Sequence, residues 1–173
     1  MRLMFMDEAR FGRINRPVRS WAPAGMRPVV DCQTVREYAY AYGAVCPADG
    51  ILDSLVLPSM QTECFEHFAA LLGERHPDEL VVVVCDGAAS HTAGALRLPE
   101  NLRVLTLPPY SPELNPAEQL WDAIREGWFA NRAHESMDAV QETLVESLVA
   151  LEGDPARIRS LTHREWICNL DAD

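Results

Sequence analysis

The sequence predicts a single α/β domain over residues 1–173, built on a mixed five-stranded sheet that is flanked by helices. The chain has 173 residues, of which 48% are hydrophobic, so it is long and apolar enough to bury one ordinary core. Strand-like runs alternate with amphipathic helical patterns, which is typical of sheets covered by helices. Residues 80–85 (LVVVVC) form a continuous β-branched run, which indicates a strand buried on both faces.

Three strands are predicted before the first helix. Residues 1–7 (MRLMFMD) are apolar apart from Arg2 and predict a strand that ends at Asp7. Residues 12–28 are rich in Arg, Pro and Gly, which favours a loop. Residues 38–46 and 51–57 are strand-like, and the turn-forming segment PADG between them predicts a hairpin. The three strands are therefore expected to be antiparallel in sequence.

A helix, two further strands and a proline-rich loop are expected next. Residues 62–75 predict a helix, because Phe65, Phe68, Ala69 and Leu72 form one apolar stripe. The run at 80–85 and a short strand at 103–107 follow, with a short helix between them. Four prolines, at 108, 109, 112 and 116, then exclude regular structure until the next helix.

The last third of the chain is predicted to be helical. One helix begins at Pro116, a second covers about residues 136–151, and a third starts at Asp154 and Pro155. Trp121 and Trp128 lie at helical spacing with other apolar residues of the first of these helices. Core packing is therefore the expected role of both tryptophans.

Composition excludes several classes of protein. The formal net charge is −11, which argues against a general nucleic-acid coat protein, because phosphate neutralisation supplies non-specific affinity. The five cysteines are scattered and form no CxxC pair, which disfavours both a disulfide framework and a zinc site. No apolar run approaches the roughly 18 residues of a membrane span, and the first residues contain no signal peptide. These features favour a cytoplasmic protein with no membrane partner.

Three carboxylates are the strongest candidates for a functional site. Asp7 and Asp86 each follow a strand-like run, and the carboxyl ends of parallel strands are where ligands collect in open sheets. Glu118 follows the proline-rich loop. Each acid also has a structural interpretation: Asp7 as a solvated loop residue, and Glu118 as the third residue of a capping box with Asn115 as N-cap and Pro116 first in the helix.

Together, the three acids suggest a metal site rather than three unrelated structural roles. Carboxylates on two strand ends and a helix start can hold two divalent cations about 4 Å apart, the arrangement used in phosphoryl transfer. An all-oxygen set of ligands suits Mg²⁺ or Mn²⁺.

Four sequence blocks resemble the catalytic domain of the DDE-type transposases, specifically the bacterial insertion-sequence branch of the mariner-like superfamily. The last block is the most specific of the four. The blocks are MFMDEARFG around Asp7, RSWAPAG around Trp21, VVVVCDGAASH around Asp86 and LPPYSPELNPAEQLW around Glu118. The resemblance implies a ribonuclease H-like fold and a catalytic triad of Asp7, Asp86 and Glu118 that holds two Mg²⁺ or Mn²⁺ ions.

The resemblance also implies an activity and partners. Such enzymes hydrolyse a phosphodiester at a transposon end and then join the freed 3′-hydroxyl to target DNA. Transposon ends and target DNA are thus the expected partners, with a homodimer as one assembly, in a bacterial cytoplasm beside the nucleoid. The helix-turn-helix region that recognises terminal repeats in this family is absent before Asp7, which predicts a separate or missing DNA-binding domain.

Several further residues are candidates for supporting roles. His91 is a candidate for orienting water or contacting the phosphate, Asn115 for touching the site, and Asp122 for replacing Glu118 as the third acid. An arginine cluster around an aromatic residue is a candidate for gripping DNA phosphates, although a solvated loop is an equal alternative. Its members are Arg10, Arg13, Arg16, Arg19 and Trp21.

Three alternatives to a transposase are open from the sequence. Another ribonuclease H-like nuclease would share the three acids but not the LPPYSPELNPAEQLW block. A phosphatase with Asp7 as nucleophile is disfavoured, because Ala9 stands where such enzymes carry a second aspartate. The third alternative is an inactive transposase remnant that serves only as a scaffold.

Overall fold

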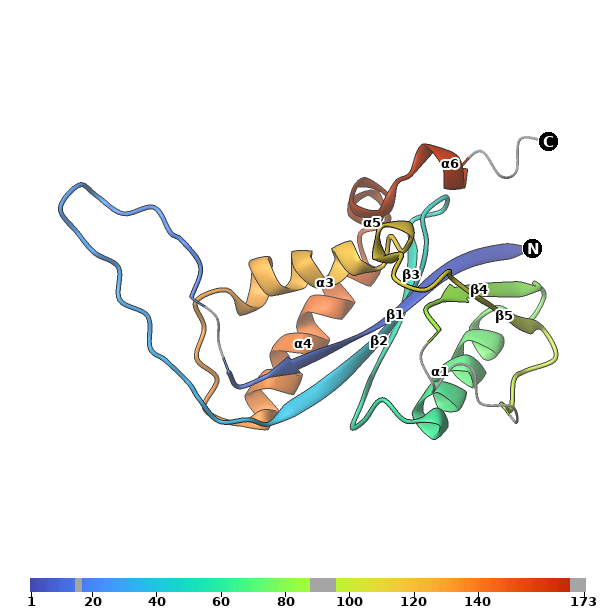
Figure 1. Ribbon diagram of the computed structural model, residues 1–173, viewed down its shortest axis with the longest axis horizontal. Coiled ribbons are helices and arrows are strands. Elements are labelled where there is room, and N and C mark those ends of the chain that lie inside the picture. The colour runs from blue at the N-terminus through green and yellow to red at the C-terminus, as the bar shows by residue number, and fades with distance from the viewer. Residues whose placement is uncertain (15–16, 88–95, 169–173) are drawn as a thin grey trace.

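The fold is a five-stranded mixed sheet with helices packed on it (Figure 1). A computed structural model describes residues 1–14, 17–87 and 96–168, and all structural statements concern these residues. The spatial strand order is β3-β2-β1-β4-β5. The pairs β1–β2 and β2–β3 are antiparallel, and the pairs β1–β4 and β4–β5 are parallel, which confirms the predicted mixed sheet. The strands are β1 (Arg2–Gly12), β2 (Tyr38–Cys46), β3 (Ile51–Leu57), β4 (Val81–Cys85) and β5 (Leu102–Thr106).

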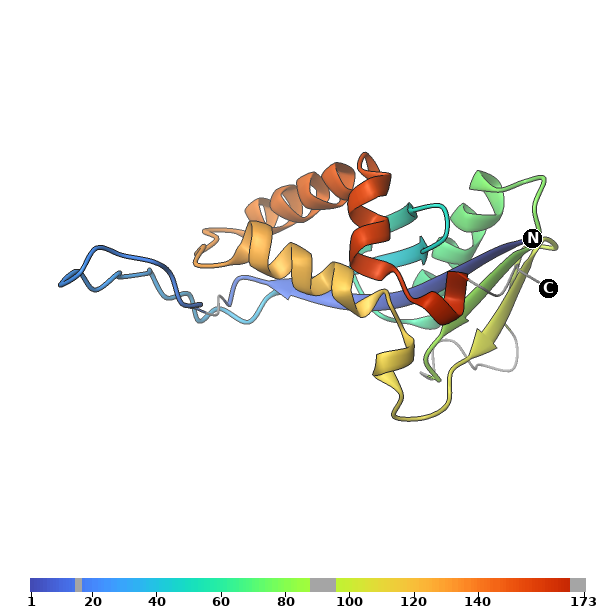
Figure 2. The ribbon, with the colours of Figure 1, turned by 90° about the horizontal axis from the view of Figure 1, so that it is seen from above.

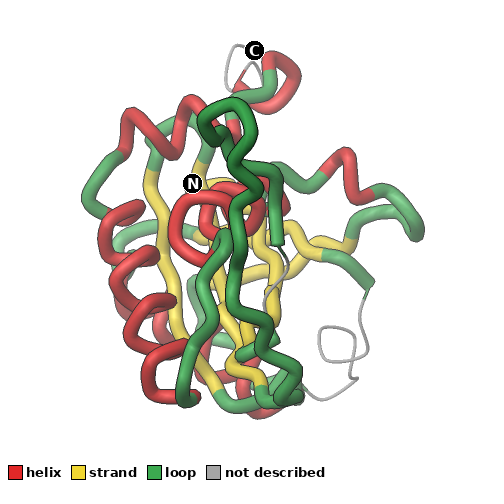
Figure 3. Tube along the Cα trace, turned by 90° about the vertical axis from the view of Figure 1, so that its left-hand side faces the viewer, coloured by secondary structure: helices red, strands yellow, loops and turns green. Residues whose placement is uncertain are grey.

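Side-chain alternation along β1 separates two hydrophobic layers. Met4 and Met6 point into a core that contains Phe65 and Phe68, whereas Phe5 points into a core that contains the later helices. The sheet therefore lies between helices, with its strands at the centre of the molecule (Figure 3). The helices are α1 (Thr62–Arg75), α3 (Glu118–Ile124), α4 (Met137–Glu152), α5 (Pro155–Thr162) and α6 (Glu165–Cys168), with a 3-10 turn η1 (Pro112–Leu114) and a π-helical turn η2 (Arg125–Phe129).

The hairpin β2–β3 and helix α1 agree with the predicted boundaries. In the hairpin, the Gly50 N–H donates to the Cys46 carbonyl at 2.8 Å, which closes the turn. Gly50 has a φ of 71°, and a Cβ there would lie 2.2 Å from the Pro155 carbonyl oxygen. Both the backbone conformation and the close approach of α5 therefore require glycine.

Strand β1 is longer than predicted, and this changes the position of Asp7. The strand continues to Gly12, so Asp7 lies in its middle rather than at its end. The parallel pairing of β1 with β4 ends at Phe5, whereas its antiparallel pairing with β2 continues to Gly12. Asp7 therefore still lies just beyond the carboxyl end of the parallel pairing.

The segment between β1 and β2 projects away from the body of the molecule (Figures 1 and 2). Its described residues, 13–14 and 17–37, contain no strand or helix, in agreement with the predicted loop. Trp21 is 102% exposed, so its side chain packs against none of the described residues. We refer to residues 13–37 as the arm.

Strand β4 differs from the prediction on one face. Val81, Val83 and Cys85 are buried, but Val82 and Val84 are only partly buried, so burial on both faces was too strong an expectation. The smaller differences concern boundaries: β5 begins one residue earlier, and the proline-rich loop contains the turn η1. A short helix was predicted between β4 and β5; the described residues there, 86–87 and 96–101, contain no helix, and residues 88–95 lie outside the described part of the chain.

The described helices include none that combines the length and apolar character needed to cross a bilayer. The cysteines whose side chains are described, Cys32, Cys46, Cys64 and Cys85, are free thiols.

Candidate active site

The three predicted acids come from separate elements around one edge of the β1–β4 pair. Asp7 lies on β1 and is partly buried, whereas Asp86 directly follows β4 and is exposed. Glu118 is the first residue of α3 and is also exposed. Besides burial, the negative charges of both Glu118 and Asp86 raise the pKa of the Asp7 carboxyl. The charges of two acids that lie far from Asp7 in the sequence therefore act on it, and the grouping of all three around a metal stays a prediction.

Asp7 is electrostatically perturbed. Burial raises the pKa of Asp7 from 3.8 to about 7, opposed by a hydrogen bond from Trp121 that favours the charged form. The neighbouring charges of Glu118, Glu8 and Asp86 make smaller contributions in the same direction as burial, and the value of about 7 includes them. A carboxyl group in such surroundings lacks a compensating positive charge, and a bound cation would supply one.

Glu118 does not have the capping role that is its structural alternative. A capping box would use the Glu118 carboxylate to accept the Asn115 backbone N–H. That N–H instead donates to the Pro112 carbonyl at 2.9 Å. Helix α3 also begins at Glu118 rather than at Pro116, because the preceding residues form turns. The Glu118 carboxylate is thus not needed to satisfy the helix start.

Asn115 joins the strand of one acid to the helix of another. Its side chain is buried, with 5% of the residue exposed. Its Nδ2 donates to the Met6 carbonyl at 3.0 Å, next to Asp7. Its Oδ1 accepts from the Ala117 N–H at 3.1 Å, next to Glu118. Asn115 therefore contacts the backbone beside two of the three acids, as well as capping the turn that precedes α3.

Replacement of Asn115 by alanine is expected to lower the free energy of unfolding by about 2 kcal/mol, because both buried backbone partners would lose their hydrogen bonds. Urea denaturation followed by circular dichroism measures this loss. The exposed Glu113 offers a control, since Glu113→Ala removes a nearby side chain without a buried bond. If the Asn115→Ala protein had the wild-type urea midpoint, the two hydrogen bonds of the Asn115 side chain would not stabilise the fold as we expect.

Trp121 makes a polar contact that the sequence did not reveal. Core packing was predicted for it, and its 1% exposure confirms this. In addition, its Nε1–H donates to Asp7 Oδ2 at 2.7 Å. The sequence signal for the contact is weak: Trp121 lies three residues after Glu118, on the same helix, and so faces a similar direction.

The donor chemistry of the three acids suits a hard divalent cation. Carboxylate oxygens are the ligands that Mg²⁺ and Mn²⁺ prefer. Within the described residues, however, no three side chains of His, Cys, Asp or Glu are grouped closely enough to form a metal cage. The fit therefore rests on the oxygen ligands and on the uncompensated charge around Asp7.

Other predicted site residues are placed differently. Asp122 is exposed and pairs with Arg125 at 3.4 Å, on the side of α3 that faces a hollow described below. His91 and Arg16 lie outside the described residues. Arg13 ties the base of the arm to the body, since its guanidinium donates to the His134 and Glu135 carbonyls. The structure thus gives Arg13 a structural role, and its contact with DNA phosphates stays a prediction.

A hollow of about 710 Å³ follows the distal half of β1 from Glu8, the residue after Asp7, and none of the three acids lines it. Arg10, Arg125 and Arg132 line it, together with the acids Glu8, Asp122 and Glu126. Arg10 stacks on the Tyr38 ring, with its guanidinium carbon 4.7 Å from the ring centre. Arg19 and Trp21 lie on the exposed arm, so the predicted arginine cluster is divided between this hollow and the arm.

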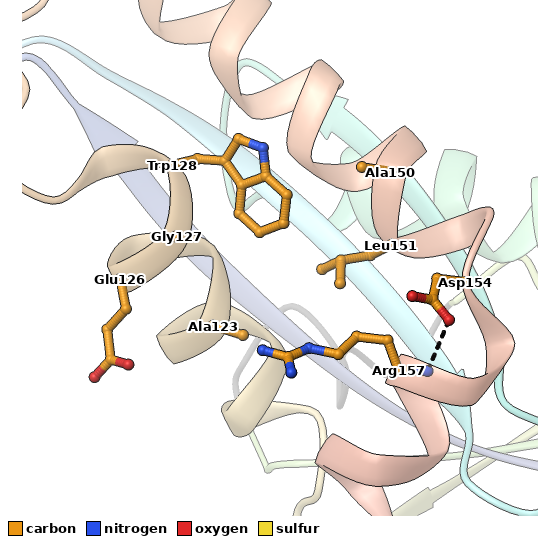
Figure 4. Close-up of a pocket in the computed structure, with 8 residues that line it drawn as sticks. All are labelled: Ala123, Glu126, Gly127, Trp128, Ala150, Leu151, Asp154 and Arg157. Atoms are coloured by element: carbon orange, nitrogen blue, oxygen red, sulfur yellow. Dashed lines mark hydrogen bonds between the residues drawn. The ribbon is translucent and has the colours of Figure 1, made fainter.

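A second hollow, of about 550 Å³, lies between α3, η2, α4 and α5 (Figure 4). The Trp128 ring and the Arg157 side chain point into it, and Asp154 caps α5 at its edge. None of its lining residues is one of the three acids. Unlike the first hollow, which is lined by Glu8, this hollow is lined by no residue next to any of the three acids in the sequence.

Structural comparison shows a similar fold in transposase complexes. A pre-cleavage Mos1 transpososome matches with a TM-score of 0.64 and 18% identity, over 99% of this chain and 56% of that chain. The Mos1 mariner paired-end complex with Mn matches with a TM-score of 0.62 and 20% identity, over 92% and 53%. The corresponding complex with Mg gives 0.61 and 19%, over 92% and 53%. This chain thus spans about half the length of those chains.

Sequence comparison identifies the family. The uncharacterized protein y4pE/y4sA of Sinorhizobium fredii (strain NBRC 101917 / NGR234) is 36% identical over 130 residues, which are 75% of this chain and 96% of that protein. Residues 2–141 match the family described as DDE superfamily endonuclease. The five-stranded mixed sheet is ribonuclease H-like, and this chain belongs to the DDE superfamily endonucleases.

Proposed function

We propose that this chain is the catalytic domain of a transposase that cleaves DNA phosphodiester bonds at transposon ends and joins the 3′-hydroxyl to target DNA. The observation that supports the proposal is the raised pKa of Asp7, which is caused chiefly by burial and to a smaller extent by the charges of Glu118, Glu8 and Asp86. Membership of the DDE superfamily endonucleases supports the same chemistry.

The three acids would hold Mg²⁺ or Mn²⁺, with two ions per site. The Mos1 structures with Mn and with Mg support this choice of metal. Two bound ions would stabilise negative charge on the attacking and leaving oxygens of the phosphodiester. Asp7 would serve as the ligand fixed most firmly by the protein, because it is on a central strand and its Oδ2 accepts the Trp121 N–H.

DNA would enter along the first hollow, which follows the distal half of β1 from Glu8. Arg10, Arg125 and Arg132 are the cations that would contact its phosphates, and such contacts position a duplex without reading its sequence. We propose that recognition of terminal repeats belongs to a separate domain, because the net charge of −11 is unfavourable for tight DNA binding by this part. A homodimer that holds two DNA ends is part of the same proposal.

The test combines metal binding with cleavage of a labelled duplex. We expect wild-type protein to bind Mn²⁺ in calorimetry and to nick DNA, and we expect Asp86→Ala and Glu118→Ala to reduce cleavage by about 10³-fold or more. Glu113→Ala is the control, since Glu113 is an exposed acid in the adjacent loop. Unchanged cleavage by both active-site variants, or absence of Mn²⁺ binding, would contradict the proposal.

The same assay separates the remaining alternatives. With an unlabelled acceptor duplex, a transposase produces joined strands as well as cut ones. Cleavage without joining indicates another ribonuclease H-like nuclease. Metal binding without cleavage of any DNA substrate indicates a protein that retains the fold as a scaffold.

A further inference from the structure

We propose that Trp121 is a positioning residue, whose indole N–H holds the Asp7 carboxylate in the orientation needed to bind a divalent cation. This inference rests on the proposed function and adds a residue to it. The observation that supports it is the 2.7 Å hydrogen bond from Trp121 Nε1 to Asp7 Oδ2.

The chemistry of the indole group suits this role. An indole N–H donates and cannot accept, so in this hydrogen bond the indole is always the donor and the carboxylate oxygen always the acceptor. Because Trp121 occupies Oδ2, rotation of the Asp7 carboxylate about its Cβ–Cγ bond breaks a charge-assisted hydrogen bond. The second oxygen, Oδ1, is then held in one direction relative to β1.

The indole ring is itself held in place by packing. Trp121 is 1% exposed and belongs to the core that contains Leu120 and Ile124. The ring of Phe11 meets it edge-on, with 6.2 Å between ring centroids and 68° between ring planes. A side chain so enclosed has little rotational freedom, so its N–H is a preorganised donor.

Gly43 provides the space for this ring beside Asp7. In the ladder between β1 and β2, Gly43 is the residue directly opposite Asp7. A Cβ at Gly43 would lie 2.8 Å from one carbon of the Trp121 ring, closer than real contacts allow. The absence of a side chain at Gly43 therefore allows the indole to lie over β2 and reach Asp7.

Helix α3 thus links two acids of the site. Its first residue is Glu118, and Trp121 follows three residues later. Any displacement of α3 would move the Glu118 carboxylate and the donor to Asp7 together. The relative placement of the two acids consequently depends on one rigid element.

The test uses Trp121→Phe, which retains an aromatic ring and removes the donor. We expect Mn²⁺ affinity, measured by calorimetry, to fall about tenfold, in the range found for partners of metal ligands. We also expect kcat for cleavage to fall about tenfold or more while KM for DNA is unchanged. Trp128→Phe is the matched control, because that indole points into the second hollow, which Asp7 does not line.

Wild-type protein gives an independent measurement that does not depend on how well the variant folds. In ¹⁵N–¹H spectra, Mg²⁺ is expected to shift the assigned indole N–H signal of Trp121 and to leave that of Trp128 in place. Gly43→Ala, which retains the indole but displaces it, is expected to weaken Mn²⁺ binding as well.

Two results would overturn the proposal. The first is a Trp121→Phe protein with lowered stability but wild-type Mn²⁺ affinity and kcat, which would make Trp121 a core residue only. The second is an indole signal that does not respond to Mg²⁺ in a protein that binds it. A wild-type protein that binds no divalent cation would instead remove the proposed function itself, and this inference with it.

Discussion

Asp7→Asn is expected to abolish DNA cleavage and, in the absence of metal, to stabilise the folded protein at pH 8 by about 2 kcal/mol. The pKa of Asp7 is raised to about 7 by burial, while the unfolded value is 3.8. Between these values the folded protein retains a proton that the unfolded chain has lost, so the free energy of unfolding falls as pH rises through this window. Asparagine is neutral at every pH and avoids this loss.

The magnitude follows from the size of the shift. A shift of one pKa unit corresponds to about 1.4 kcal/mol, and the partial exposure of Asp7 reduces the full value by about half. Urea denaturation in EDTA at pH 3.5, 5, 6.5 and 8 measures the difference. The two proteins are expected to converge at pH 3.5, where the Asp7 carboxyl is largely protonated in both states. A variant that is less stable than wild type at pH 8 would contradict the assigned electrostatics.

Addition of Mg²⁺ is expected to reverse the order of stability at pH 8. A cation that binds the folded state alone stabilises it in proportion to the logarithm of its concentration above the dissociation constant. Wild-type protein has the Asp7 charge that such binding requires, whereas Asp7→Asn lacks it. Asp7 would thus be a residue whose charge lowers stability without metal and enables function with it.

Asp53→Ala is expected to lower the free energy of unfolding by about 3 kcal/mol without changing the cleavage rate per folded molecule. Asp53 lies on β3 with 4% exposure, opposite Ala44. Its two oxygens bind Arg75 Nη1 and His76 Nε2, each at 2.7 Å. Removal of this carboxylate takes the buried partner from Arg75 and His76, which keep only longer contacts, with Glu152 at 3.8 Å and Glu79 at 3.6 Å.

Asp49→Ala provides the matched control. Asp49 also pairs with an arginine, Arg2, at 2.5 Å, but its side chain is 54% exposed. Exposed ion pairs contribute about 0–1 kcal/mol, so this variant is expected to resemble wild type. Thermal and urea unfolding of the two variants test the difference, and equal stability losses would contradict the role of burial. Because neither residue lies among the three acids, cleavage by the folded fraction serves as the second readout.

Elements governed by local patterns were predicted well. The hairpin β2–β3 and helix α1 have the predicted limits, because turn chemistry at Pro47–Gly50 and one apolar stripe depend only on neighbouring residues. The end of β1 was predicted wrongly. Charged residues follow Asp7, and only pairing with β2 shows that Arg10 faces outward while Ala9 and Phe11 are buried.

For the candidate site, the sequence suggested three acids, which stay a prediction, but it did not suggest the residues that support them. Asp7, Asp86 and Glu118 could be named from sequence, because each lies at a transition between an apolar run and a loop or helix start. Their mutual geometry stays a prediction to be tested with metal. The bond between Trp121 and Asp7 joins residues 114 positions apart, and an aromatic stripe at helical spacing gives no sign of it.

By itself, the sequence determined the α/β class, the hairpin, the first helix and the identity of the three acids. Periodicity, turn residues and the motif around each acid are local properties, so they are visible in the sequence alone. Only the tertiary structure decided that Asp7 lies in the middle of a strand, that Asn115 and Trp121 hold its surroundings, and that Gly43 makes room for the indole. These facts depend on which strand pairs with which and on which helix covers the sheet. Contacts between distant residues decide both, and local patterns do not specify such contacts.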